Sequence, residues 1–151
     1  MAENTNFLKV DELIDLAVRF EQDSVDYYQV LQEHATDAKV LDLLKTLEGQ
    51  EIEHRDLLKN YELGPGPYPM LQYGPSFSLS LPTLENDNPS LNELIDVAIE
   101  REVVSREIYH NTAGQVFGNL AQLLEDLAAF EGEHETKLKD MRSYLRGEDR
   151  I

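Results

Sequence analysis

Two segments of this sequence carry the pattern Glu-x-x-His at positions where apolar residues are expected. The first pair is Glu51 and His54, and the second is Glu131 and His134. Leucines precede and follow both pairs at a spacing of three or four residues, so each pair occupies two consecutive core positions of an amphipathic helix. One such pair alone is weak evidence, because glutamate and histidine are common on solvated helix faces. Two pairs in the same register indicate a buried functional site made of carboxylate and imidazole groups.

Two further glutamates fall on the inner faces of other helical segments. Glu21 lies between Phe20 and Ser24, and Glu102 occupies the corresponding place in a later segment. Four carboxylates and two imidazoles are therefore expected to converge at mid-height of one helical bundle. The candidate metal ligands are Glu21, Glu51, His54, Glu102, Glu131 and His134.

Buried carboxylates need compensation, because an unpaired buried ion costs several kcal/mol and neighbouring carboxylates raise one another's pKa. The nearby basic residues are expected to point mostly outward; they are Arg19, Arg55, Arg101 and Arg106. Divalent cations are the simplest alternative, and two of them balance four carboxylates in formal charge. A mixed glutamate and histidine ligand set suits iron or manganese, and also zinc.

The segments that must position these residues have the 3.6-residue periodicity of helices. We expect helices over about 10–34, 37–62, 91–112 and 119–146, within a single domain covering 1–151. A capping box at Ser90 and Glu93 begins the third helix, and Gly147 follows the last one. The crossover, residues 63–90, contains all six prolines and is not helical. The sequence therefore predicts an all-α fold, a four-helix bundle of two antiparallel hairpins joined by a long crossover loop that packs on another surface.

The two expected hairpins repeat one another in sequence. At an offset of 81, Glu21 and Tyr28 become Glu102 and Tyr109, and at an offset of 80 the first Glu-x-x-His becomes the second. Such a repeat implies a pseudo-twofold axis through the bundle.

Several other polar residues could belong to the site or could be ordinary. Tyr28 and Tyr109 lie two turns after Glu21 and Glu102, on the same inner faces. Core packing explains them, and the alternatives are hydrogen bonding to the ligands or a redox-active phenol. We expect four polar residues on the surface: His34, Glu53, His110 and Glu133.

Composition excludes several functional classes. The 151 residues have a formal charge of −17, which disfavours binding to nucleic acid or to an anionic membrane surface. The absence of cysteine excludes a disulfide scaffold, a zinc ribbon, an iron–sulfur cluster and a thiol nucleophile. The sequence has no apolar run of about 20 residues that could span a bilayer. The beginning of the sequence lacks the pattern of a signal peptide, so a cytoplasmic location is expected.

With these motifs, residues from about 10 to 146 resemble a rubrerythrin-type (erythrin) member of the ferritin-like di-iron carboxylate superfamily. The resemblance implies that Glu51 and Glu131 bridge two iron ions, while the other four ligands are terminal. It departs from the rubrerythrin pattern at two points. The chain has no cysteines for a rubredoxin domain, and the positions three residues from Glu102 are Ile99 and Ser105 rather than a further glutamate.

The resemblance implies a non-haem di-iron oxidoreductase that reduces hydrogen peroxide or dioxygen, a rubrerythrin-like peroxidase. Because no rubredoxin domain is present, electrons are expected from an external rubredoxin-like donor or from Fe(II). The alternatives are a ferroxidase or iron-handling protein that oxidises Fe(II), and a metal-binding bundle without enzymatic activity. Manganese or zinc could replace iron. We also expect a homodimer to which the apolar residues of the crossover contribute.

Overall fold

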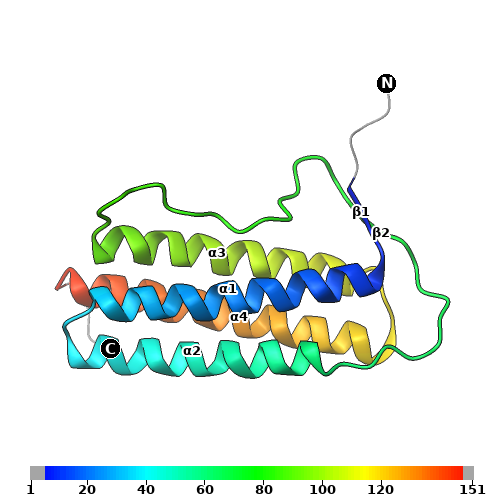
Figure 1. The fold of residues 1–151 in the computed structure, drawn as a ribbon, viewed down its shortest axis with the longest axis horizontal. Helices are drawn as coiled ribbons and strands as arrows, with labels where there is room; N and C mark the ends of the chain where they lie inside the picture. Colours follow the sequence, from blue (N-terminus) through cyan, green and yellow to red (C-terminus); the bar gives the residue numbers. More distant parts are fainter. Residues whose placement is uncertain (1–5, 148–151) are drawn as a thin grey trace.

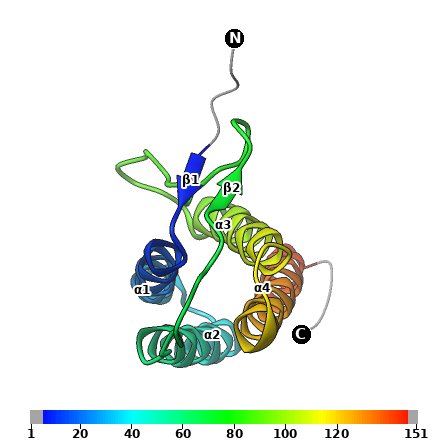
Figure 2. The same cartoon turned by 90° about the vertical axis from the view of Figure 1, so that its right-hand side faces the viewer.

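Four long helices make up most of the molecule (Figure 1). The computed structural model describes residues 6–147. The helices are α1 (Val10–His34), α2 (Ala38–Lys59), α3 (Leu91–Ala113) and α4 (Gly118–Leu145). Helices α1 and α2 form one antiparallel hairpin and α3 and α4 form the other, and the end view shows the four grouped as a bundle (Figure 2). The predicted all-α four-helix bundle is confirmed.

Local signals in the sequence explain where the helices begin and end. The Asp37 side chain accepts hydrogen bonds from the first backbone N–H groups of α2. Ser90 and Glu93 form the predicted capping box at the start of α3, with each side chain bonded to the backbone of the other. After α4, Gly147 adopts a positive φ of 75°, and its N–H bonds back to the Tyr144 carbonyl. A residue without Cβ adopts this left-handed conformation without strain.

Helix α2 ends earlier than predicted, at Lys59 rather than Glu62. The Asn60 N–H bonds to the carbonyls of Asp56 and Leu58, and the Tyr61 N–H also bonds to Leu58, so the last turn tightens and stops. The crossover therefore comprises residues 60–90. None of the four described helices combines the length and the apolar character required to span a bilayer.

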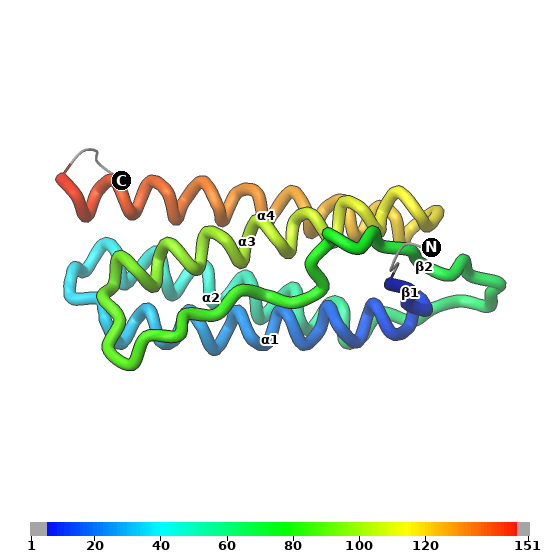
Figure 3. Tube along the Cα trace, turned by 90° about the horizontal axis from the view of Figure 1, so that it is seen from above, coloured from blue at the N-terminus to red at the C-terminus, as the bar shows by residue number. Residues whose placement is uncertain are grey.

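The crossover packs against the bundle along much of its length (Figure 3). It contains strand β2 (Leu71–Tyr73), which pairs antiparallel with β1 (Asn6–Leu8). Leu71 and Tyr73 are buried at one end of the bundle, where Tyr73 hydrogen-bonds to Thr112 on α3. Neither three-residue strand was predicted, because such short segments carry too little alternation to be recognised.

The apolar core is divided into two clusters. One contains Leu13, Leu58 and Leu124, and the other contains Leu44 and Leu138. The Glu-x-x-His pairs lie between these leucines in the sequence of α2 and α4, as the seam pattern predicted. A buried polar layer therefore interrupts an otherwise apolar core, and its side chains need partners.

Candidate metal centre

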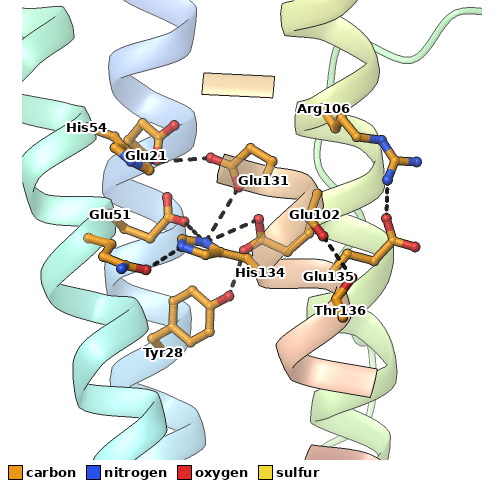
Figure 4. Close-up of polar contacts among 12 residues, drawn as sticks. Glu21, Tyr28, Glu51, His54, Glu102, Arg106, Glu131, His134, Glu135 and Thr136 are labelled. Carbon is orange, nitrogen blue, oxygen red and sulfur yellow. Dashed lines mark hydrogen bonds and ion pairs between the residues drawn. The ribbon is translucent and has the colours of Figure 1, made fainter. Parts of the chain in front are cut away.

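All four helices contribute to the polar layer (Figure 4). Helix α1 supplies Glu21, α2 supplies Glu51 and His54, α3 supplies Glu102, and α4 supplies Glu131 and His134. Each of the six residues is at most 5% exposed. The three-residue spacing within each Glu-x-x-His pair places both side chains on the same inner face of a helix. The structure thus brings together all six predicted ligand residues.

The six residues form two overlapping groups. One group is Glu21, Glu51, His54 and Glu131, and the other is Glu51, Glu102, Glu131 and His134. Within each group, one potential ligand atom per residue lies within 4.8 Å of the others. Each group contains one histidine and one glutamate of its own, and both contain Glu51 and Glu131. This is the arrangement that two neighbouring cations with shared carboxylates require.

The Nδ1 atoms of both histidines face the carboxylates. The Nδ1 of His134 lies 2.6 Å from Glu51 Oε1 and 3.7 Å from Glu102 Oε2. The Nδ1 of His54 lies 3.8 Å from Glu131 Oε1 and 3.9 Å from Glu21 Oε2. The two imidazole rings stack with their centroids 5.9 Å apart.

The polar atoms at the centre of the layer have no hydrogen-bond partners. Among the described residues, seven such buried atoms belong to the six side chains: Glu21 Oε2, both carboxylate oxygens of Glu51, His54 Nδ1, Glu102 Oε2, Glu131 Oε1 and His134 Nδ1. Two of them, His134 Nδ1 and Glu51 Oε1, lie 2.6 Å apart but without the geometry of a hydrogen bond. An unsatisfied buried polar atom costs about 1–3 kcal/mol, and more if it is charged. Oxygen and imidazole nitrogen atoms that converge without partners are the donor set of a metal site, so these residues fit divalent cations.

Burial strongly shifts the pKa values of these groups. Burial, together with the charge of Glu102, raises the pKa of Glu51 from its ordinary 4.5 to about 8. Burial also raises the pKa values of Glu21 and Glu131 well above the ordinary value, and neighbouring glutamates add to the effect. Burial lowers the pKa of His54 from 6.5 to about 4. Without a cation, these three carboxyl groups hold protons well above their ordinary pKa, and His54 is neutral near pH 7.

Two tyrosines connect α1 and α3 by hydrogen bonds to one oxygen each of Glu102 and Glu21. Tyr28 on α1 donates a hydrogen bond of 2.6 Å to Glu102 on α3, and Tyr109 on α3 donates one of 2.6 Å to Glu21 on α1. Burial raises the pKa of both phenols well above 10, so both remain donors. Among the alternatives stated for these tyrosines, hydrogen bonding to candidate ligands is the one that these contacts match.

Arg101 does not point outward as expected. It is only 6% exposed, donates a hydrogen bond of 3.0 Å to the Pro82 carbonyl of the crossover, and stacks on the Tyr27 ring at 4.7 Å. Its charge lowers the pKa of Glu51, although burial outweighs that effect. Arg101 aligns in the repeat with the buried Phe20, and this correspondence is the signal in the sequence that could have placed it inward.

Sequence reasoning also missed Gln50 and Phe130, which contact the two histidines. Gln50 lies 2.8 Å from His134, and the Phe130 ring lies 4.9 Å from the ring of His54. The signal that could have found them is their position, since each immediately precedes a Glu-x-x-His pair. The residues expected on the surface are exposed: His34, Glu53, His110 and Glu133.

Comparison with known proteins identifies similar folds but no close relative. No protein-family model matches the chain, and no curated protein sequence matches it. A hypothetical protein from Pyrococcus furiosus has a similar structure, with a TM-score of 0.70 and 21% identity over 95% of this chain and 94% of the other. A Thermotoga maritima protein proposed to be a ferritin-like diiron-carboxylate protein has a TM-score of 0.67 and 21% identity, over 91% and 96% of the two chains. These similarities show a shared fold.

Proposed function

We propose that this ferritin-like bundle is a non-haem di-iron oxidoreductase that reduces hydrogen peroxide or dioxygen, as a rubrerythrin-like peroxidase does. The observation that carries the proposal is the pair of overlapping ligand groups that share Glu51 and Glu131 and whose inward-facing atoms are unpaired. The Thermotoga maritima structure, proposed to be a diiron-carboxylate protein, supports the same assignment.

Each side chain has a role in this proposal. Glu51 and Glu131, which belong to both groups, would be held in common by the two ions, while Glu21 with His54 and Glu102 with His134 would each serve one ion. When bound, two ferrous ions supply the two electrons that reduce a peroxide. Tyr28 and Tyr109 hold the terminal carboxylates in place through their hydrogen bonds. An external rubredoxin-like donor, or Fe(II) itself, returns the electrons, because the chain has no cysteine to hold a rubredoxin centre.

The surroundings of the site favour a small oxidant over an organic substrate. Each of the six ligand residues is at most 5% exposed, so the centre is shielded from bulk solvent. The side chain of His54 is 7% exposed and that of His134 is fully buried. Peroxide and dioxygen are smaller than organic substrates, so a centre this enclosed favours them.

A ferroxidase that takes Fe(II) as its substrate is the second candidate. The formal charge of −17 favours it, because a strongly negative surface raises the local concentration of cations. The same six ligands serve either reaction. The two candidates differ in what is consumed, since a peroxidase turns over peroxide with a separate donor, whereas a ferroxidase oxidises many equivalents of Fe(II) with dioxygen.

The test is metal analysis followed by turnover. Protein purified from iron-replete cells is expected to contain about two metal ions per chain and to consume peroxide with a reduced rubredoxin-like donor. Glu51→Gln should lose both properties. The matched control Glu53→Gln, at an exposed position two residues away, should keep both. One ion or none per chain in the unsubstituted protein would contradict the dinuclear assignment.

We also propose that the protein is a homodimer. The crossover buries Leu71 and Tyr73 within its own chain but leaves Met70 50% exposed, and Phe7 on β1 is 56% exposed. Exposed apolar residues grouped on one surface are a common feature of subunit interfaces.

A further inference from the structure

We propose that Gln50 is a positioning residue that makes the two metal positions unequal, so that the ion beside His134 binds first and more tightly. This inference rests on the proposed function, because it assumes that the two ligand groups bind metal. It depends on a difference between the two halves of the molecule at a position next to the repeated ligand residues.

The His134 ring is held from both sides. Its Nδ1 faces the carboxylates, and its Nε2 lies 2.8 Å from the Oε1 atom of Gln50 on α2. When Nδ1 binds a metal ion, the proton of the neutral ring is on Nε2 and needs an acceptor. The Gln50 amide oxygen is that acceptor. It therefore fixes both the orientation of the ring and the tautomer that leaves Nδ1 free for metal.

The His54 ring has no such acceptor. The residue that corresponds to Gln50 at the repeat offset of 80 is Phe130, whose ring packs at 4.9 Å from the imidazole of His54. Among residues 6–147, the Nδ1 atom of His54 has no hydrogen-bond partner, and no glutamine occupies the place beside this ring that Gln50 occupies beside His134. Phe130 is itself 40% exposed, so this side of the site is covered by one aromatic ring near solvent.

The two histidines also differ in how closely their ligand groups are assembled. The shortest distance from Nδ1 to a carboxylate oxygen is 2.6 Å at His134 and 3.8 Å at His54. His134 is fully buried, whereas the His54 side chain is 7% exposed. A ligand whose ring is already held loses less conformational freedom when it binds the ion. Hydrogen-bond partners of metal-bound histidines typically contribute about 10- to 100-fold in affinity.

The experiment is a Co(II) titration of the metal-free full chain, followed by visible absorption and by competition with a chelator. Two binding steps are expected for the unsubstituted protein. Repulsion between two cations separates the steps at any dinuclear site, so histidine variants assign each step to a position. His134→Ala should remove the tighter step and leave the weaker one, and His54→Ala should do the reverse.

Variants at the two repeated positions then test the cause. Gln50→Leu should weaken the tighter step by about 10- to 100-fold, and Gln50→Glu, which keeps an acceptor oxygen, should restore most of that loss. Phe130→Gln should strengthen the step assigned to His54. Thermal unfolding of each metal-free variant gives an independent measure of folding, so a lost step in a stable variant reports on metal binding alone.

The Co(II) titrations distinguish failure of the role of Gln50 from failure of the dinuclear site. An unchanged separation of the steps in Gln50→Leu, or a tighter step that His54→Ala removes, would overturn the role of Gln50 and leave the dinuclear proposal intact. Fewer than two Co(II) ions bound to the unsubstituted chain would overturn both proposals.

Discussion

The hydroxyl of Tyr28 on α1 donates a 2.6 Å hydrogen bond to the Glu102 carboxylate on α3. The Tyr109 hydroxyl makes the reciprocal bond to Glu21 on α1. The two helices come from different hairpins, so these bonds join the hairpins at the level of the site. They also occupy one oxygen of each of these two glutamates and leave the other oxygen, Oε2, buried without a hydrogen-bond partner.

Removal of the Tyr28 hydroxyl is therefore expected to affect both metal binding and folding. Tyr28→Phe leaves Glu102 Oε1 without its donor, which should reduce the free energy of unfolding of the metal-free protein by about 1–3 kcal/mol. Metal affinity at the His134 group should fall about 10-fold or more. Urea unfolding and metal titration measure the two effects.

Tyr27→Phe is the matched control, since Tyr27 donates to the Leu94 carbonyl and not to a candidate ligand. It should lower stability without changing metal affinity. Equal losses of metal affinity in both variants would show that the Tyr28 bond has no special part in the site.

Substitution of a glutamate shared by both groups is expected to remove more bound metal than substitution of a histidine. Glu51 belongs to both ligand groups, so Glu51→Gln should abolish binding of both ions. His54 belongs to one group, so His54→Ala should weaken one ion and leave the second bound. Metal analysis after dialysis against a weak chelator distinguishes these results. Similar, independent losses at all six positions would contradict the bridging assignment.

The stability of the metal-free protein should fall as pH rises from about 6.5 to about 8.5. Burial raises the pKa of Glu51 from 4.5 to about 8, so between these values the folded state binds a proton that the unfolded state has lost. The free energy of unfolding then decreases by about 1.4 kcal/mol per pH unit for each such carboxyl group. The contribution is fully present below about pH 4.5 and is lost as pH rises through about 8.

Protonation of His54 does not contribute to the change in stability over this pH range. Its pKa is about 4 in the folded state and ordinarily 6.5, so its stabilising contribution is complete above about pH 6.5 and is lost only as pH falls toward 4. Urea unfolding across the range should show the decline, and Glu51→Gln should make it shallower. Bound metal displaces the same protons, so the stabilisation by metal should grow with pH. Metal-free stability that rises with pH over this range would refute the proposed clustering.

The sequence predicted the site better than its surroundings. Glu51 with His54 could be recognised because two polar residues interrupt a leucine seam, and the repeat in α4 made the interruption significant. Tyr28 could be placed on the inner face by periodicity alone. These predictions succeed because helical spacing dictates which side chains share a face.

What the sequence could not show depends on contacts between distant segments. Arg101 occupies an inner position because the Pro82 carbonyl and the Tyr27 ring receive it, and neither is near it in sequence. The different partners of His54 and His134 depend on the packing of α2 against α4.

The last prediction concerns the proposed dimer and the outer face of the small sheet. Phe7 pairs with Gln72, and Met70, which immediately precedes β2, is exposed like Phe7, whereas the neighbouring Leu71 is fully buried. Replacing both Phe7 and Met70 with serine should therefore give monomers by light scattering without disturbing the core. Leu71→Ser, in contrast, should destabilise the chain itself, because Leu71 is fully buried.

Val30→Ser is the control for this prediction, since Val30 is an exposed apolar residue on α1 away from the sheet. It should leave the dimer unchanged. Metal binding should survive in the monomeric double variant, because all six ligand residues lie on the helices of one chain. A double variant that remains dimeric would place the interface elsewhere, and an unsubstituted protein that is already monomeric would refute the dimer. Loss of metal together with the dimer would show that the site depends on assembly.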